Sequence, residues 1–340
     1  MVDIQNLSYD ELQEYLVNNS FKPYNASQIF DWLYKKNSTD FNSMSNLSKS
    51  LREFLIGNFV ISNMKIMKKS KSNDGTVKIL WELSDGQTVE SVALFHPNHI
   101  TFCISTQVGC ALGCEFCATG RNGFVRDLSA AEIINQVIFL ENAIKGSVKN
   151  IVYMGMGEPF LNYDNVIKSI NTLNHPKGKN IGIRNFTIST SGIIPGIDRL
   201  SNEEKIPRLS VSLHSVDNKK RSYLMPINSK YSLDDLITSL EKFQKKTKDR
   251  ITFEYILIKN FNCSIEDAHQ ISKKLKNIKK MMNLIPVNPV DKRFKRPSED
   301  EISIFMKELE ALGVTAVLRN EKGTDIDAAC GQLRRRISES

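Results

Sequence analysis

The feature that most restricts the fold is a regular alternation of strand-like and helix-like segments after residue 100. The strand-like segments are short and apolar, and most helix-like segments begin with a capping Ser or Asn. The predicted strands are residues 101–106, 148–154, 184–190, 208–213, 251–258, 282–287 and 314–319, and the predicted helices are residues 129–144, 162–174, 232–248, 264–275 and 298–312. Repeated strand–helix units form a parallel sheet, and six or seven units are too few to close an eight-unit barrel. The sequence therefore predicts an α/β fold built as an open, partial βα barrel.

Two smaller regions precede this alternating part. Residues 8–57 contain three segments with helical periodicity, and from about residue 60 to 96 the periodicity changes to two. Asp-Gly pairs at residues 74–75 and 85–86 indicate hairpin turns in the second region. We therefore divide the chain into a small N-terminal helical accessory domain, a β-hairpin extension, the partial barrel and a C-terminal segment, at residues 1–58, 59–98, 99–320 and 321–340.

The composition is that of an ordinary globular protein in a reducing compartment. Hydrophobic residues make up 41% of the 340 and charged residues 25%, and no apolar run reaches the length of about 18 that predicts a membrane span. The first residues lack the basic region and apolar core of a secretory signal. Six cysteines, three of them in one short segment, favour metal binding over a disulfide scaffold. We expect a cytoplasmic protein that does not bind membranes.

The net charge of +8 favours a polyanionic partner such as nucleic acid. The excess is unevenly placed: residues 1–60 carry five basic and seven acidic residues, whereas lysines and arginines crowd residues 242–296, and Arg334, Arg335 and Arg336 follow near the C-terminus. Each such lysine, taken alone, is better explained as a solvated helix residue.

The first predicted strand leads directly into a glycine-punctuated segment, residues 109–120. It holds Cys110, Cys114 and Cys117 in a Cys-x3-Cys-x2-Cys array, close enough for the thiolates to converge on one inorganic centre. Three ligands are one too few for a closed zinc site or a fully ligated four-iron cluster. A four-iron cluster held by three cysteines would keep one iron open to a substrate. Structural zinc, or cysteines that bind nothing, are the alternatives.

Polar residues also follow several later strands. Glu158, Ser189, Ser212 and Asn288 come at the ends of four predicted strands, next to a glycine or proline in two cases. A single such residue usually caps a turn. Because the carboxyl ends of parallel strands meet at one edge of a sheet, four of them beside a cysteine loop indicate a ligand site.

The cysteine spacing resembles the signature of the radical S-adenosylmethionine (SAM) enzymes, and residues 154–159 resemble their "GEP" segment. In that superfamily a [4Fe-4S] cluster with one open iron binds the amino and carboxylate groups of SAM and cleaves SAM to a 5′-deoxyadenosyl radical. The resemblance implies a radical SAM partial barrel with Cys110, Cys114 and Cys117 as cluster ligands. It also implies SAM contacts at Gly157, Glu158, Ser189, Ser212, Leu213, His214 and Asn288.

Other stretches resemble one family within this superfamily, the RlmN family of dual-specificity methyltransferases, which act on adenine carbon-2 in 23S rRNA and tRNA. The matching stretches are the N-terminal helices and residues 89–92, 103–120, 154–159, 189–192, 212–214, 224–228, 283–286 and 325–333. The same residues are similar to antibiotic-resistance relatives that methylate carbon-8. Residues 28–36 and 46–52 favour the carbon-2 branch.

The resemblance implies a mechanism that uses two SAM molecules per turnover. The first methylates Cys330, and the second yields the radical that activates this methyl group for addition to adenine, so that RNA is transiently attached to the protein. Glu90 would accept the proton from the modified carbon, and Cys103 would release the product by forming a disulfide with Cys330. A flavodoxin-like electron donor and a thiol reductant are implied partners, and we expect a monomer.

An alternative of another class stays open at this point. A non-catalytic RNA-binding protein with a structural metal would suit the positive charge, and on spacing alone Cys103 and Cys330 read as a small buried residue and an inert thiol. Cys263 matches no functional position of the family. This alternative gives no reason for Glu158 or Cys330.

Overall fold

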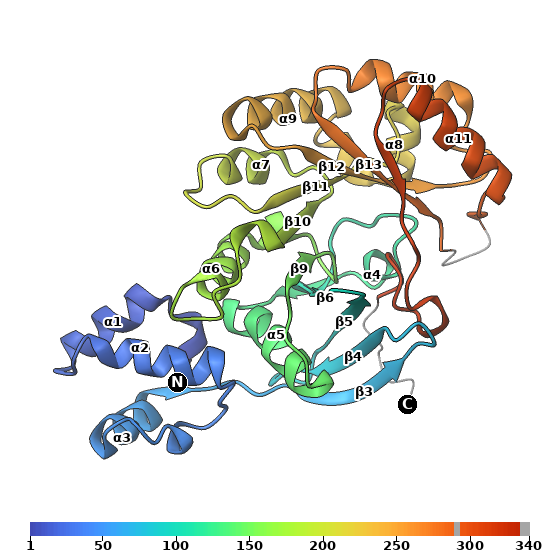
Figure 1. The fold of residues 1–340 in the computed structure, drawn as a ribbon. Helices are drawn as coiled ribbons and strands as arrows, with labels where there is room; N and C mark the ends of the chain where they lie inside the picture. Colours follow the sequence, from blue (N-terminus) through green and yellow to red (C-terminus); the bar gives the residue numbers. More distant parts are fainter. Residues whose placement is uncertain (289–292, 334–340) are drawn as a thin grey trace.

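A ten-stranded mixed sheet organises the molecule (Figure 1). The computed structural model describes residues 1–288 and 293–333, so the predicted basic positions Lys292, Arg334, Arg335 and Arg336 lie outside the described residues. The sheet order is β3-β4-β5-β6-β9-β10-β11-β12-β13-β14. The strands are β3 (Lys65–Lys71), β4 (Val77–Glu82), β5 (Thr88–His96), β6 (His99–Cys103), β9 (Asn150–Tyr153), β10 (Phe186–Thr190), β11 (Arg208–Ser212), β12 (Ile251–Leu257), β13 (Lys280–Pro286) and β14 (Ala316–Leu318).

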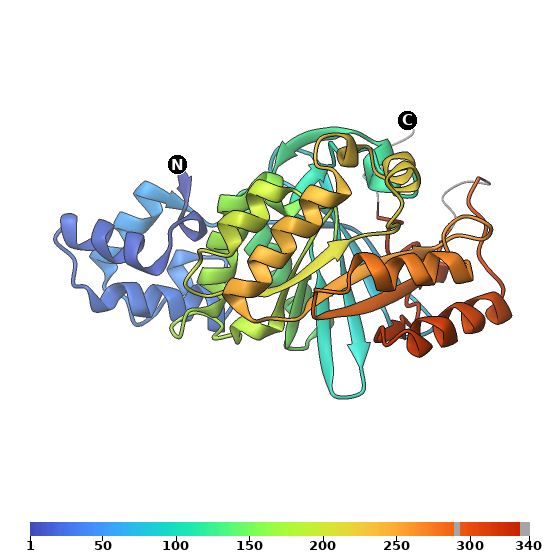
Figure 2. The same cartoon turned by 90° about the horizontal axis from the view of Figure 1, so that it is seen from above.

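The part of the sheet from β6 to β14 is parallel, and each of its strands pairs with the next strand of the same sheet along the chain. β3 and β14 are the two free edges, so the sheet is an open, partial barrel as predicted. Helices follow most of these strands and lie along the outer face of the curved sheet (Figures 1 and 2). They are α5 (Ala130–Ile144), α6 (Tyr163–Asn174), α7 (Ile194–Leu200), α8 (Asn218–Leu224), α9 (Leu233–Thr247), α10 (Ile265–Lys274) and α11 (Glu299–Ala311).

Serine caps begin four of the five helices predicted after residue 100, whereas Asn162 at the start of α6 makes no capping hydrogen bond through its side chain. Ser129, Ser264 and Ser298 each form a capping box with the acidic residue three positions later, and Ser232 caps α9. The sequence did not predict α7 and α8, because seven residues are too few to show helical periodicity. It also missed three short elements around the cysteine loop, β7 (Gln107–Gly109), β8 (Phe124–Asp127) and α4 (Ala118–Arg121).

The predicted hairpins extend this same sheet. β3, β4, β5 and β6 are successive antiparallel neighbours, and the two Asp-Gly turns place Gly75 and Gly86 at positive φ. In this register Glu90 lies opposite Leu80, and Val92 lies opposite Cys103. Glu90 and Cys103 therefore face the same side of the sheet.

The N-terminal helices pack beside α5 and α6 (Figure 1). They are α1 (Tyr9–Asn18), α2 (Tyr24–Phe30) and α3 (Lys49–Asn58), with single-turn segments at Ile4–Asn6, Asp31–Lys35 and Phe41–Ser43 and a two-residue pair of strands, β1 (Val2–Asp3) and β2 (Phe59–Val60). The Tyr9 ring stacks on His175 at 4.4 Å, and Lys168 bonds Glu11 at 3.0 Å. One continuous set of buried apolar side chains joins these helices to the sheet. The four-part division therefore stays a prediction.

None of the helices in the described part of the chain is both long and apolar enough to span a lipid bilayer.

Candidate active site

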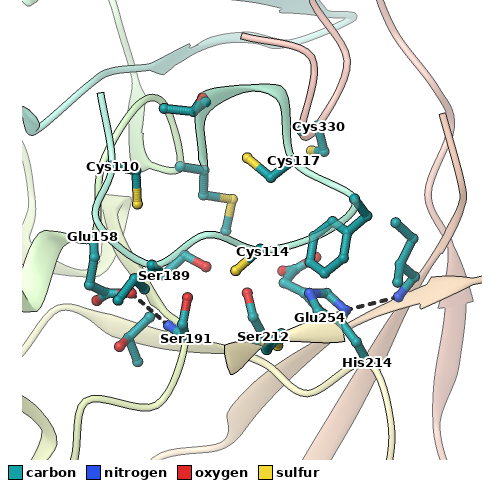
Figure 3. Close-up of a pocket in the computed structure, with 18 of the residues that line it drawn as sticks. Cys110, Cys114, Cys117, Glu158, Ser189, Ser191, Ser212, His214, Glu254 and Cys330 are labelled. Carbon is teal, nitrogen blue, oxygen red and sulfur yellow. Dashed lines mark hydrogen bonds between the residues drawn. The ribbon is translucent and has the colours of Figure 1, made fainter. Parts of the chain in front are cut away.

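A cavity lies at the carboxyl ends of the parallel strands, covered by the cysteine loop (Figure 3). The thiols of Cys110, Cys114 and Cys117 line it from the loop side. Facing them are the residues predicted at the strand ends, Gly157, Glu158, Ser189, Ser212, His214 and Asn288. The structure thus brings together three thiols and a set of polar groups that come from five separate segments of the chain.

The loop is held in a tight path by hydrogen bonds at both ends. Cys110 donates its backbone N–H to Gly123 O at 2.9 Å, and Glu115 donates to Leu224 O at 3.0 Å. Gly109 has a φ of +79°, and a Cβ at this position would lie 1.9 Å from Gly123 O. The close approach that carries the first thiol to the cavity therefore requires glycine.

We expect Gly109→Ala to lower the free energy of unfolding by about 1–3 kcal/mol from backbone strain, with the backbone overlap adding to this. Iron content after anaerobic reconstitution should fall with it, because Cys110 is displaced. Gly57→Ala is the matched control: Gly57 lies in α3 with no atom within 4 Å of the added Cβ, so this change should not destabilise the protein. A Gly109→Ala variant with parental stability and iron content would contradict this reading of the loop.

Burial disfavours the charged thiolate form of Cys110 and Cys114. Burial is the main cause that raises the pKa of Cys110 to about 12; a backbone hydrogen bond at Leu112 acts against this shift, and the neighbouring Cys117 and Glu158 contribute to it. Burial, followed by Cys117 and Cys110, also raises the pKa of Cys114. Thiolates here would be stable only next to a bound cation or metal centre. The donor set therefore fits a metal centre that accepts three thiolates.

Glu158 is held rigidly opposite the thiols. Its carboxylate accepts hydrogen bonds from Ser191 N at 2.8 Å and Phe160 N at 3.1 Å, and its pKa is raised by burial. Gly157 precedes it with a φ of +101°, and a Cβ there would lie 2.6 Å from Gln107 Cβ. This geometry aims a buried carboxylate into the cavity, where it can accept hydrogen bonds from an ammonium group.

His214 and Leu213 differ in how they take part. His214 lines the cavity, accepts Ile256 N–H through Nδ1 at 3.1 Å, and packs edge-on against Phe116. Burial, with a smaller effect of Arg221, lowers the pKa of His214 to about 3, so the ring is neutral near pH 7. Leu213 is fully buried, and its side chain is not among those lining the cavity.

Cys330 lies on a C-terminal loop that closes one wall of the same cavity. The loop is fixed to the cysteine loop, since Ala118 N donates to Gly331 O at 2.7 Å and Thr119 Oγ1 to Leu333 O at 2.5 Å. On its other side Lys78 Nζ donates to Asp327 O at 2.9 Å. Cys330 is exposed in this structure, and Figure 3 shows it next to Cys117.

Cys103 and Cys330 share a second cavity of about 430 Å³ that adjoins the first. Burial raises the pKa of Cys103 to about 12, and Cys330 is the next cause of this shift. All six cysteines are free. The two thiols, 227 positions apart in the sequence, are therefore electrostatic neighbours in the fold.

Glu90 is buried on the same sheet face but does not line either of these cavities. Its carboxylate pairs with Lys78 Nζ at 3.1 Å, and both side chains are buried. Because Lys78 also binds Asp327 O, one buried ammonium connects Glu90 to the loop that carries Cys330.

Sequence reasoning missed three charged residues of this site, of which Glu254 and Arg221 are buried and Arg319 is half-buried. Glu254 lines the first cavity and accepts a hydrogen bond from Ser210 Oγ at 2.7 Å, and Arg319 lines both cavities 3.9 Å from Glu254. Arg221 lies behind the cavity wall. Glu254 had a sequence signal, because it is an isolated acid in an otherwise apolar strand, and Arg319 stands at the end of a predicted strand.

Comparisons with known proteins agree with this geometry. The model of the radical SAM superfamily matches residues 104–271, and the model of the ribosomal RNA large subunit methyltransferase N-terminal domain matches residues 2–61. A protein of Thermotoga petrophila named probable dual-specificity RNA methyltransferase RlmN is 50% identical over 98% of both chains. A protein of Petrotoga mobilis with the same name is also 50% identical, over 98% of this chain and 97% of its own.

The chain belongs to the RlmN family. Its fold agrees with this assignment: the crystal structure of a radical SAM methyltransferase from Sphaerobacter thermophilus superposes with a TM-score of 0.93, at 39% identity over 98% of this chain and 99% of that one.

Membership of the radical SAM superfamily implies a [4Fe-4S] cluster and SAM as cofactors. The first cavity fits both, with thiols on one side and a buried carboxylate on the other. Among the described residues, no group of three or more His, Cys, Asp or Glu side chains is placed to hold a single metal ion. In a four-iron cluster each cysteine binds a different iron, so its ligands stand further apart than those of one ion.

Proposed function

We propose that this chain is a radical SAM methyltransferase that methylates carbon-2 of an adenosine in the peptidyl transferase centre of 23S rRNA and of an adenosine in the tRNA anticodon loop. The names of the relatives, at about half identity over nearly the full chain, support RNA methylation. The observation that carries the proposal is the placement of Cys330 and Cys103 in one cavity, beside the cysteine loop. A protein that only bound RNA would have no use for this arrangement.

Cys110, Cys114 and Cys117 would hold the cluster, and Glu158 would bind the ammonium group of SAM. Ser189, Ser212 and Asn288 line the same cavity and would contact the rest of that molecule. When bound, the cluster supplies the electron that cleaves SAM. His214 is neutral and bonded to the backbone through Nδ1, so it serves as a wall of the site rather than as a proton donor.

Cys330 would take a methyl group from one SAM through its thiolate, forming a sulfur–carbon bond. Once the radical that a second SAM supplies has taken a hydrogen atom from this methyl group, the carbon on Cys330 would bond to adenine carbon-2. Two SAM molecules are therefore consumed in each turnover. An adenine ring carbon is a poor nucleophile, which is why the carbon must be delivered from a protein thiol.

Release of the product would use Glu90 and Cys103. Glu90 accepts the proton from carbon-2, and one electron passes from the radical adduct to an external one-electron carrier of the flavodoxin type. The Cys103 thiolate then attacks the Cys330 sulfur, the sulfur–carbon bond breaks, and its electron pair stays on the carbon, which takes a proton to become the methyl group. The resulting Cys103–Cys330 disulfide needs two electrons from an external thiol reductant.

The position of Glu90 supports a role in the same site. It lies on the same face of the sheet as Cys103, and Lys78 joins its carboxylate to the loop that carries Cys330. The RNA, an electron donor and a thiol reductant are the partners that this proposal requires, and the net charge of +8 suits a polyanionic substrate. Cytoplasmic location and a monomeric state stay predictions.

The test is to reconstitute the full chain anaerobically, supply SAM and a reductant, and map the modified nucleosides of 23S rRNA and tRNA by mass spectrometry. We expect 2-methyladenosine in both RNAs and formation of 5′-deoxyadenosine from SAM. Finding 8-methyladenosine would refute carbon-2 methylation. A protein with neither iron–sulfur absorption nor SAM cleavage would refute the radical mechanism altogether.

A further inference from the structure

Arg221, on α8, is a buried cation without a charged partner. Its side chain is 1% exposed. The guanidinium donates to three neutral oxygens: Asn228 Oδ1 and Ser191 O at 2.7 Å each, and Ser212 O at 3.2 Å. Its Nε–H has no hydrogen-bond partner, and within residues 1–288 and 293–333 no carboxylate pairs with it. A buried charge of this kind is costly unless an opposite charge lies nearby.

Arg221 lies directly behind the wall of the cavity that holds the three cysteines. The guanidinium donates to the backbone oxygens of Ser191 and Ser212, and both residues line that cavity. It also acts on Glu158 through one residue, since Ser191 O accepts from Arg221 while Ser191 N donates to Glu158. Arg221 itself does not line the cavity. It stands behind the ends of β10 and β11, so it reaches a bound group through its electric field rather than by contact.

An iron–sulfur cluster in this cavity would bring the missing negative charge. Three thiolates and the inorganic sulfides outweigh the charge of the irons, and one-electron reduction adds a further negative charge. In a medium of low dielectric constant a fixed cation a short distance away stabilises the reduced form more than the oxidised form. Net charge around the cluster is one of the protein's main controls on its reduction potential.

We propose that Arg221 is the built-in counter-charge of the cluster that we assign to Cys110, Cys114 and Cys117, and that it raises the reduction potential of that cluster. The inference rests on the proposed function, because it requires the cluster. It makes Arg221 a positioning residue: it touches neither SAM nor RNA, and it sets how readily the cluster accepts the electron used for SAM cleavage.

A purely structural role is the competing explanation. Arg221 joins the ends of β10 and β11 to the segment Pro226–Ser229, and this bracing alone would justify a buried guanidinium. Bracing depends on the hydrogen bonds, whereas the proposed role depends on the charge. The two explanations separate when the charge is changed and the reduction potential is measured.

The experiment is a spectroelectrochemical titration of the anaerobically reconstituted full chain. Arg221→Gln removes the charge, Arg221→Lys keeps it, and Arg199→Gln is the control, since Arg199 is an exposed α7 residue paired with Asp164. We expect Arg221→Gln to lower the equilibrium constant for one-electron reduction at least tenfold, a shift of about 59 mV to more negative potential. For Arg221→Lys and Arg199→Gln, this equilibrium constant should stay within threefold of the parental value. A parental potential in Arg221→Gln would overturn the proposal.

Asn228→Asp provides a second route if Arg221→Gln does not load a cluster. It places a carboxylate 2.7 Å from the guanidinium, neutralising the cation while Arg221 stays in place. The potential should again become more negative, and an unchanged potential would overturn the proposal. If the parent chain itself shows no iron–sulfur absorption, the proposed function fails. If the parent holds a cluster and its reduction potential is the same in Arg221→Gln and Asn228→Asp, the proposed role of Arg221 is wrong, while the proposed function stands.

Discussion

Cys330→Ala should lose RNA methylation by at least about 10⁴-fold, the scale of loss when an enzyme's covalent nucleophile is removed, while SAM cleavage continues. The reason is that Cys330 would carry the transferred carbon, whereas the cysteines that would hold the cluster are on a separate loop. The measurement is methyl incorporation into RNA beside 5′-deoxyadenosine formation, in one anaerobic assay.

Cys263→Ala is the matched control for this change. Cys263 is half-buried, lies outside both cavities, and bonds Ile258 O at 3.4 Å. Its loss should leave methylation unchanged. If Cys330→Ala transferred methyl groups at a rate near that of Cys263→Ala, the carbon could not travel by way of Cys330, and the proposed mechanism would be wrong.

The second large effect is expected from Cys103→Ala, which should stop turnover at the covalent protein–RNA adduct. Cys103 shares a cavity with Cys330 and is its electrostatic neighbour, so in the proposed mechanism it is the thiol that would attack the Cys330 sulfur. The adduct should appear as a slow band on a denaturing gel, sensitive to nuclease, with close to one RNA per active protein.

The pH dependence of adduct release in the parent gives a separate check. Burial raises the pKa of Cys103 to about 12, so the thiol is almost fully protonated near neutral pH. Release should therefore quicken as the pH rises toward that value, following the thiolate fraction. If the Cys103→Ala variant released methylated RNA at the parental rate, Cys103 would have no role in product release.

The fold was largely predictable because it depends on local patterns. Apolar periodicity located the seven parallel strands, and serine caps such as Ser129 and Ser298 located the helix starts. The strand-end groups Glu158 and Ser189 were predictable for a related reason: parallel strands in consecutive order must bring their ends to one edge. Here they do line one cavity.

The rest of the site depends on contacts between distant segments. Nothing in the sequence indicates that Gly331 O bonds Ala118 N or that Lys78 reaches Asp327 O. Arg221 follows two lysines in the sequence and reads as a solvated charge, yet α8 turns it inward. Family resemblance could name Cys103 and Cys330, but only the tertiary fold brings the two thiols to one cavity.

The order in which the ribosome makes the chain has a consequence for this cavity. The cysteine loop and the strand ends through β13 emerge first, and the wall formed by Arg319 and the Cys330 loop emerges last. Until then the three thiols face an open side, through which iron and sulfide can be delivered. We expect that cluster insertion is easiest on the unfinished chain, and that the closing segment then protects what has been installed from oxygen.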